Sequence, residues 1–276
     1  MDVSVPVQVP LIGSINTNPN GYNKIIAFEQ ACRKYRNCYI ELDLNHLSWF
    51  DANLSALFDA VLYRLQQELG LYFVVDIELV NKKFPILLRN GFLSSIRSLP
   101  DNAGTTVPVE TFSTKDDEKF FDYLKNKLLS HPQLSLSRPR KDKLLIHFLE
   151  LFANIDTHAR TSHPVFACGQ FFPRLHKLHF TLVDLGVGYL APIHSFTSGQ
   201  VDTSSKAIAW ALHDTNTTKS NDVTGGLGLK QLHSYCHSND GEMQIITGDA
   251  YWSNRTKAQT VSHFNGSIVN VLFNCG

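Results

Sequence analysis

Residues 141–162 read KDKLLIHFLELFANIDTHARTS, and the spacing of their side chains predicts a helix with two different faces. One broad apolar face is made by Leu144, Leu145, Phe148, Leu149, Leu151, Phe152 and Ile155. The other side carries a polar stripe of Glu150, Asn154, Thr157, His158 and Thr161. We expect the helix to begin after Ser137 as its N-cap, with Pro139 in the first turn, where proline is tolerated.

The polar stripe contains an acid and an amide that suit phosphate chemistry. Glu150 and Asn154 are four residues apart, so their side chains lie next to each other on a helix. A carboxylate there can take a proton from a hydroxyl or a water. An amide oxygen can bind a hard cation such as Mg²⁺. Taken alone, the stripe is more typical of a solvated helix face, so its interpretation depends on motifs further along the chain.

Two glycine motifs come later, in a fixed order. A strand expected over residues 177–183 ends in DLGVG at residues 184–188, and GGLGL at residues 225–229 opens another apolar-periodic segment. With the helix motif, they resemble the ATP-binding domain shared by DNA gyrase, histidine kinases, mismatch-repair ATPases and anti-sigma-factor serine kinases, the GHKL superfamily. The resemblance covers roughly residues 117–276 and is closest in motif style to the anti-sigma-factor kinases.

The resemblance implies roles for individual residues around a bound ATP with Mg²⁺. Glu150 matches the general base, Asn154 the magnesium ligand, and Asp184 the carboxylate that accepts a hydrogen bond from the adenine amino group. The other implied nucleotide-binding positions are His158, Gly186, Gly188, Thr218, Lys219, Gly225, Gly226, Gly228, Leu229 and Ser267. For His158 a packed core histidine is an equal alternative. For Thr218 and Lys219, a solvated turn without a nucleotide contact is a nearly equal alternative.

The first half of the chain alternates strands and helices. An alternating strand over residues 39–44, an amphipathic helix that ends at Gly70 and a strand over residues 72–77 predict a right-handed parallel crossover. The segment YIELDLNHLSWFDANLSALFDAVL at residues 39–62 resembles a STAS domain. That family is phosphorylated on a Ser or Thr two residues after an aspartate, whereas Asn53 follows Asp51 here. We therefore expect a partner-binding or sensing module without this switch.

Composition and boundaries complete the prediction of the fold. The class is α/β: a STAS-like α/β domain over residues 1–112 and a GHKL-type two-layer α/β sandwich over residues 113–276, with a linker at residues 102–114. Lys and Arg equal Asp and Glu at 25 each, so no net field favours nucleic acid or a membrane. The absence of a long apolar run or a signal-peptide pattern, with five cysteines that lack metal or redox spacing, predicts a cytoplasmic protein.

The functional expectation is a Mg·ATP-binding regulatory protein. It is a slow ATPase that acts as a conformational switch, coupled to the STAS-like module and to a protein partner of STAS type or another regulatory class. One alternative is a serine/threonine kinase of the anti-sigma-factor type that phosphorylates a STAS-domain partner. The other is an ATP-gated scaffold that does not hydrolyse. A homodimer is also left open.

Overall fold

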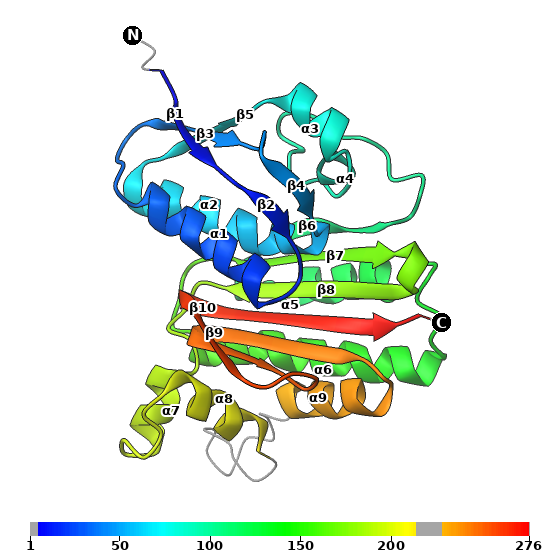
Figure 1. Ribbon diagram of the computed structural model, residues 1–276. Coiled ribbons are helices and arrows are strands. Elements are labelled where there is room, and N and C mark those ends of the chain that lie inside the picture. Colours follow the sequence, from blue (N-terminus) through cyan, green and yellow to red (C-terminus); the bar gives the residue numbers. More distant parts are fainter. Residues whose placement is uncertain (1–4, 214–227, 276) are drawn as a thin grey trace.

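A five-stranded sheet lies at the centre of the computed structural model, which describes residues 5–213 and 228–275 (Figure 1). Its strands, in spatial order, are β6 (Thr106–Phe112), β7 (Val165–Phe172), β8 (Lys177–Asp184), β10 (Gln259–Asn274) and β9 (Glu242–Ser253). Every neighbouring pair in this sheet is antiparallel. The chain therefore has the mixed α/β class that the sequence predicts.

Helices cover one face of this sheet because alternate strand residues point toward them. Leu178, Phe180 and Leu182 of β8 share a buried core with α6 (Arg138–His158). The rings of Phe148 and Phe180 meet edge to face, with centroids 5.3 Å apart. Residues of three more elements belong to the same core: α5 (Asp117–Tyr123), the π-helical turn η2 (Leu124–Leu128) and α9 (Gly228–Ser238). Helix α6 begins after Ser137 with a proline in its first turn, as predicted.

The first half of the chain forms a smaller parallel sheet with two long helices. Strands β1 (Val7–Pro10), β3 (Tyr39–Asp43) and β5 (Tyr72–Val75) pair in the order β1-β3-β5. Helices α1 (Pro19–Cys32) and α2 (Ser55–Leu69) pack against them, and α2 ends at Gly70, which is left-handed with φ 63°. Smaller elements are β2 (Gly13–Ile15), β4 (Leu47–Phe50), η1 (Ala52–Leu54), α3 (Ile77–Lys83) and α4 (Ile86–Arg89). The predicted parallel crossover is confirmed.

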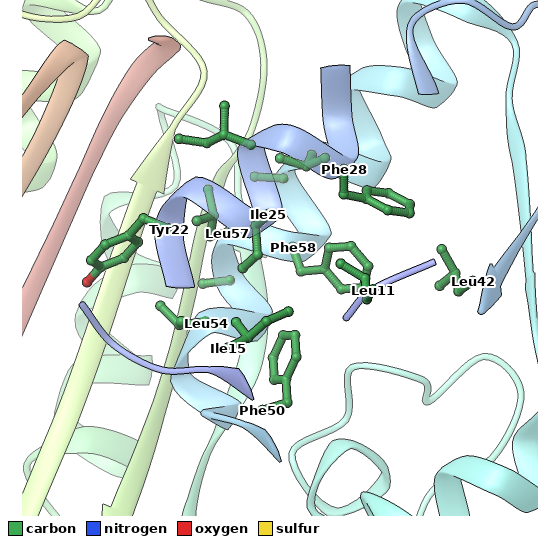
Figure 2. Close-up of a cluster of buried hydrophobic side chains, with 14 of the residues drawn as sticks. Leu11, Ile15, Tyr22, Ile25, Phe28, Leu42, Phe50, Leu54, Leu57 and Phe58 are labelled. Carbon is green, nitrogen blue, oxygen red and sulfur yellow. The ribbon is translucent and has the colours of Figure 1, made fainter. Parts of the chain in front are cut away.

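Helices α1 and α2 lie between the two sheets, so the five-stranded sheet is buried on both faces (Figure 1). Figure 2 shows the core within the N-terminal half, where Ile25 of α1 lies with Leu57 and Phe58 of α2. The same core continues into the sheet through Phe166, Val183 and Ile268. We call residues 5–105, which form this layer, the N-terminal module.

Polar pairs fix the position of the module on the sheet. Asn53, at 0% exposure, donates its side-chain N–H to Thr181 Oγ1 at 2.9 Å and to Asn270 Oδ1 at 3.3 Å. Tyr22 donates its hydroxyl to Gln244 Oε1 at 2.7 Å. A buried hydrogen bond depends on alignment, so these pairs admit one register of the module on the strands.

Three predicted segments differ from the structure. Residues 102–114 contain strand β6 in place of a linker, and β6 belongs to the five-stranded sheet, so the boundary predicted after residue 112 falls after the first strand of this sheet. Residues 189–224 match the ATP lid of the resembled family, with a short helical patch expected over residues 206–212; the described part, residues 189–213, contains α7 (Leu190–Phe196) in addition to α8 (Ser204–Leu212), which includes that patch. The sequence indicates three strand-like runs in the tail, near residues 243–247, 259–261 and 268–273; the structure has two long strands there, β9 and β10, with β10 irregular between Thr260 and Ser267. A 3-10 turn, η3 (Pro173–Leu175), joins β7 and β8.

Candidate functional site

The start of α9 packs directly against the middle of α6. A Cβ atom built on Gly228 would lie 2.6 Å from the Cβ of Glu150 and 3.0 Å from the carbonyl oxygen of His147. Only glycine therefore permits this approach. The next residue, Leu229, is 6% exposed and lies in the core beneath the sheet. Its side chain faces the core, so a nucleotide-binding role for Leu229 would be carried by its main chain.

Glu150 carries a buried oxygen that makes no hydrogen bond to any described residue. The atom is Oε2, and Nδ1 of His147, one turn earlier on α6, is in the same condition. Burial lowers the pKa of His147, while Gln231 opposes that effect. A buried acceptor without a donor costs about 1–3 kcal/mol, so such an atom indicates a position that a ligand or water completes. His147 has no role in the sequence motif, although helical spacing places it beside Glu150.

Asp184 is the last residue of β8 and is 3% exposed. Antiparallel pairing places Ser267 of β10 opposite it, and the Ser267 hydroxyl donates to Asp184 Oδ2. The N–H of Gly186 donates to Oδ1 at 2.9 Å. Burial raises the pKa of this carboxyl, and the hydrogen bonds from Ser267 and Gly186 act in the opposite direction. The structure thus brings together Asp184, Gly186 and Ser267, three of the predicted site residues.

The glycine turn after Asp184 contacts the end of α6. A Cβ on Gly186 would lie 2.3 Å from the carbonyl oxygen of Ala159, and that oxygen accepts the N–H of Val187 at 2.9 Å. The predicted absence of a side chain at this position is therefore a packing requirement.

Gly188 has a left-handed backbone, with φ 68°, and a Cβ there would lie 2.4 Å from Thr247 Oγ1. The Thr247 hydroxyl accepts the N–H of Tyr189 at 3.1 Å and donates to the carbonyl oxygen of Gly266 at 3.0 Å. Thr247 therefore holds the turn against β10. No local sequence pattern marks Thr247, because its importance depends on the pairing of β9 with β10, which places it opposite Ser267.

The two clusters meet α6 at different turns. Glu150 and Gly228 lie at one turn, and Ala159 and Gly186 at another, about 2.5 turns or about 14 Å along the axis. Asn154 lies between them on the same helix and is half-buried. We call this order along α6 the row: it runs from half-buried Glu150 through Asn154 to Ala159, which contacts the glycine turn after the buried Asp184.

Some predicted site residues are outside the part of the chain that can be described. Thr218, Lys219, Gly225 and Gly226 lie in residues 214–227, and for His158 only the helical backbone is described. Within residues 5–213 and 228–275, no group of three or more His, Cys, Asp or Glu side chains is arranged to hold a metal ion. A magnesium ion here would accordingly need oxygens from its nucleotide as well as from Asn154.

Two cavities flank the row. One, of about 680 Å³, lies between α5 and α6 and is lined by Glu150 together with Phe121 and Leu149. The other, of about 360 Å³, lies beside the glycine turn and is lined by Val187 and Thr247, among others. Asn154 and Asp184 line neither of these two cavities.

Comparison of the sequence with protein-family models and with curated proteins gives no match. None of the helices in the described residues is long and apolar enough to cross a membrane.

Proposed function

We propose that this chain is a Mg·ATP-binding regulatory protein with a GHKL-type ATP-binding sandwich from β6 onward and a STAS-like N-terminal module. The observation that carries the proposal is the row along α6. A buried aspartate with its hydroxyl and glycine partners lies at one end, and an acid packed against a glycine helix start lies at the other. The two ends contact α6 at Glu150 and at Ala159, about 14 Å apart along the helix axis, a length that suits an extended nucleoside triphosphate.

The Asp184 end is the base-binding end. A carboxylate only accepts hydrogen bonds, and it has lone pairs beyond those used by Ser267 and Gly186 for the 6-amino group of adenine. Guanine presents a carbonyl oxygen at that position, so two acceptors would meet at a buried site. The mismatch costs about 1–3 kcal/mol, which favours ATP over GTP.

The Glu150 end is the phosphate end. The first N–H groups of α9 have no partners within their own helix, and they favour phosphate oxygens at the position where Gly228 approaches α6. The buried Glu150 Oε2, which has no hydrogen-bond partner among the described residues, fits a water held beside Mg·ATP at this end. Asn154 would hold the Mg²⁺, which when bound neutralises charge on the phosphate oxygens. Glu150 would orient a water and take its proton.

The proposed role is that of a slow ATPase that acts as a switch. The N-terminal module covers the outer face of the same sheet, so a change at the site has a direct route to the module and to a protein partner. All five cysteines are free thiols, which supports a reducing, cytoplasmic setting.

Calorimetric titration with Mg·ATP, together with an assay of phosphate release, tests the proposal. We expect the unmodified chain and Glu150→Gln to bind Mg·ATP with similar affinity, and phosphate release to fall about 10²–10⁴-fold in the variant only. Glu118→Gln is the matched control, because Glu118 lines the same cavity from α5.

A chain that does not bind Mg·ATP would refute the proposal. Transfer of the labelled γ-phosphate to a Ser or Thr of a partner would establish the kinase in place of the ATPase. Tight binding with neither product would establish the scaffold.

A further inference from the structure

Arg64 of α2 is a buried arginine bound to a buried acid. Its side chain is 4% exposed, and that of Glu29 on α1 is 5% exposed. Arg64 donates from Nε to Glu29 Oε1 at 3.0 Å and from Nη2 to Glu29 Oε2 at 2.6 Å. Two parallel bonds of this kind fix the plane of the guanidinium group. The position of Arg64 is therefore set by the helix pair of the N-terminal module.

The remaining terminal nitrogen of Arg64 reaches out of the module to β10. Nη1 donates to the carbonyl oxygen of Asn265 at 2.5 Å, and the guanidinium carbon lies 4.8 Å from the centroid of the Phe264 ring. Phe264 is 1% exposed and belongs to the module's core. One side chain thus holds two successive residues of β10 against α2.

These two residues lie directly before the base-binding end of the candidate site. The pairing of β10 with β9 is irregular between Phe264 and Ser267, and Gly266 has φ 128°. A Cβ on Gly266 would lie 2.1 Å from the carbonyl oxygen of Asp184. The irregular segment therefore brings the main chain of β10 against Asp184 and sets where the Ser267 hydroxyl meets the carboxylate.

We propose that Arg64 is a positioning residue for the base-binding end of the site, through which the N-terminal module controls the affinity for the adenine base. This inference rests on the proposed nucleotide binding. The link runs from Glu29 through Arg64 to Asn265, and from there along the chain to Ser267 and Asp184. Without Arg64, the irregular segment of β10 loses the charged donor that fixes Asn265, so the placement of Ser267 against Asp184 depends on strand pairing and Thr247 alone.

The chain provides a matched control for this test. Arg33 also binds Glu29, from Nη2 to Oε1 at 2.7 Å, but its other contact is Glu68 at 2.9 Å on the outside of the module. Arg33→Met and Arg64→Met each remove an arginine from the same carboxylate, and only Arg64 has a bond to β10. The double variant Glu29→Gln/Arg64→Met removes both buried charges, so that no unpaired charge prevents folding.

The measurements are the dissociation constants for Mg·ATP, Mg·GTP and Mg·tripolyphosphate, with circular dichroism as the check of folding. In Arg64→Met and in the double variant we expect ATP to bind about tenfold more weakly, the size of one charge-assisted hydrogen bond. Tripolyphosphate, which carries no base, should keep its affinity, and the preference for ATP over GTP should shrink. Arg33→Met should behave as the unmodified chain.

The outcomes separate this inference from the proposed function. If the unmodified chain binds neither ATP nor tripolyphosphate, both fall together. If it binds both ligands and Arg64→Met matches Arg33→Met, only the role of Arg64 is overturned. Equal losses for ATP and tripolyphosphate in a folded variant would also overturn it, because they indicate general loosening of the site.

Discussion

The turn from Gly186 to Gly188 shows how single residues shape the candidate site. Gly186 allows the main chain to approach Ala159 at the end of α6. Gly188 allows a left-handed backbone in a place where Thr247 leaves no room for a side chain. Both glycines were identified from the sequence, because DLGVG is a local pattern. Thr247 and Arg64 were not, since each acts across a contact between segments distant in the chain.

Comparing Gly188→Ala with Gly91→Ala separates the cost of a left-handed backbone from the cost of a clash with Thr247. A left-handed backbone costs a residue with a Cβ about 1–2 kcal/mol, and the clash with Thr247 Oγ1 adds to that cost. Gly91 is the control, because it has φ 82° and nothing within 4 Å of its Cβ position. We expect Gly188→Ala to lower the free energy of unfolding in urea by more than Gly91→Ala and to weaken Mg·ATP binding. Equal losses of stability would show that Thr247 moves aside without cost.

At the scale of elements, α2 carries a carboxyl group, that of Asp59, whose burial disfavours its charged form. Burial raises the pKa of Asp59 from 3.8 to about 6. The folded state therefore binds a proton more tightly than the unfolded chain does. The stability that this proton gives is complete below about pH 4 and is lost as the pH rises through about 6.

Asp59→Asn should remove this pH dependence, since the amide resembles the neutral acid. We expect the variant to be more stable than the unmodified chain at pH 7, by up to about 3 kcal/mol, and equally stable at pH 4. Urea unfolding at pH 4, 5, 6 and 7 measures the difference at each step. Parallel curves for the two proteins would contradict the assignment.

The sequence predicted some elements well because their signals are local. The apolar periodicity of α2 and α6, the end of α2 at Gly70, the start of α6 after Ser137, and the strand before Asp184 are confirmed. Strand β6 was predicted as a linker because Gly104 and Pro108 suggest irregular chain. Its structure depends on pairing with β7, more than fifty residues later. The joining of the tail segments into β10 likewise depends on long-range pairing with β9 and β8.

At the scale of the whole molecule, the N-terminal module and the five-stranded sheet share one core. The sequence predicted two domains with a linker, and nothing in its local patterns indicated that α1 and α2 would be enclosed between two sheets. Asn53 is an example. It departs from the STAS pattern in the sequence, and in the structure it is a buried contact with Thr181 and Asn270.

A shared core predicts a single cooperative unfolding transition. Trp49 lies in the module, where its ring N–H donates to Asp51 Oδ1 at 2.6 Å, and Trp252 lies on β9. With the other two tryptophans replaced by phenylalanine in each case, fluorescence reports one half at a time. We expect both reporters to give the same urea midpoint and slope. Two separated transitions would show that the halves unfold independently.

The order of these layers along the chain also matters during synthesis. The ribosome completes α2 about 200 residues before it completes β10, an interval of about 10–40 s at ordinary elongation rates. In that interval the surface of α1 and α2 that later packs against the strands is exposed to solvent. The polar groups of Tyr22 and Asn53 are then free to hydrogen-bond with water, which makes this surface less apolar. In the folded protein Gln244, Thr181 and Asn270 take the place of that water.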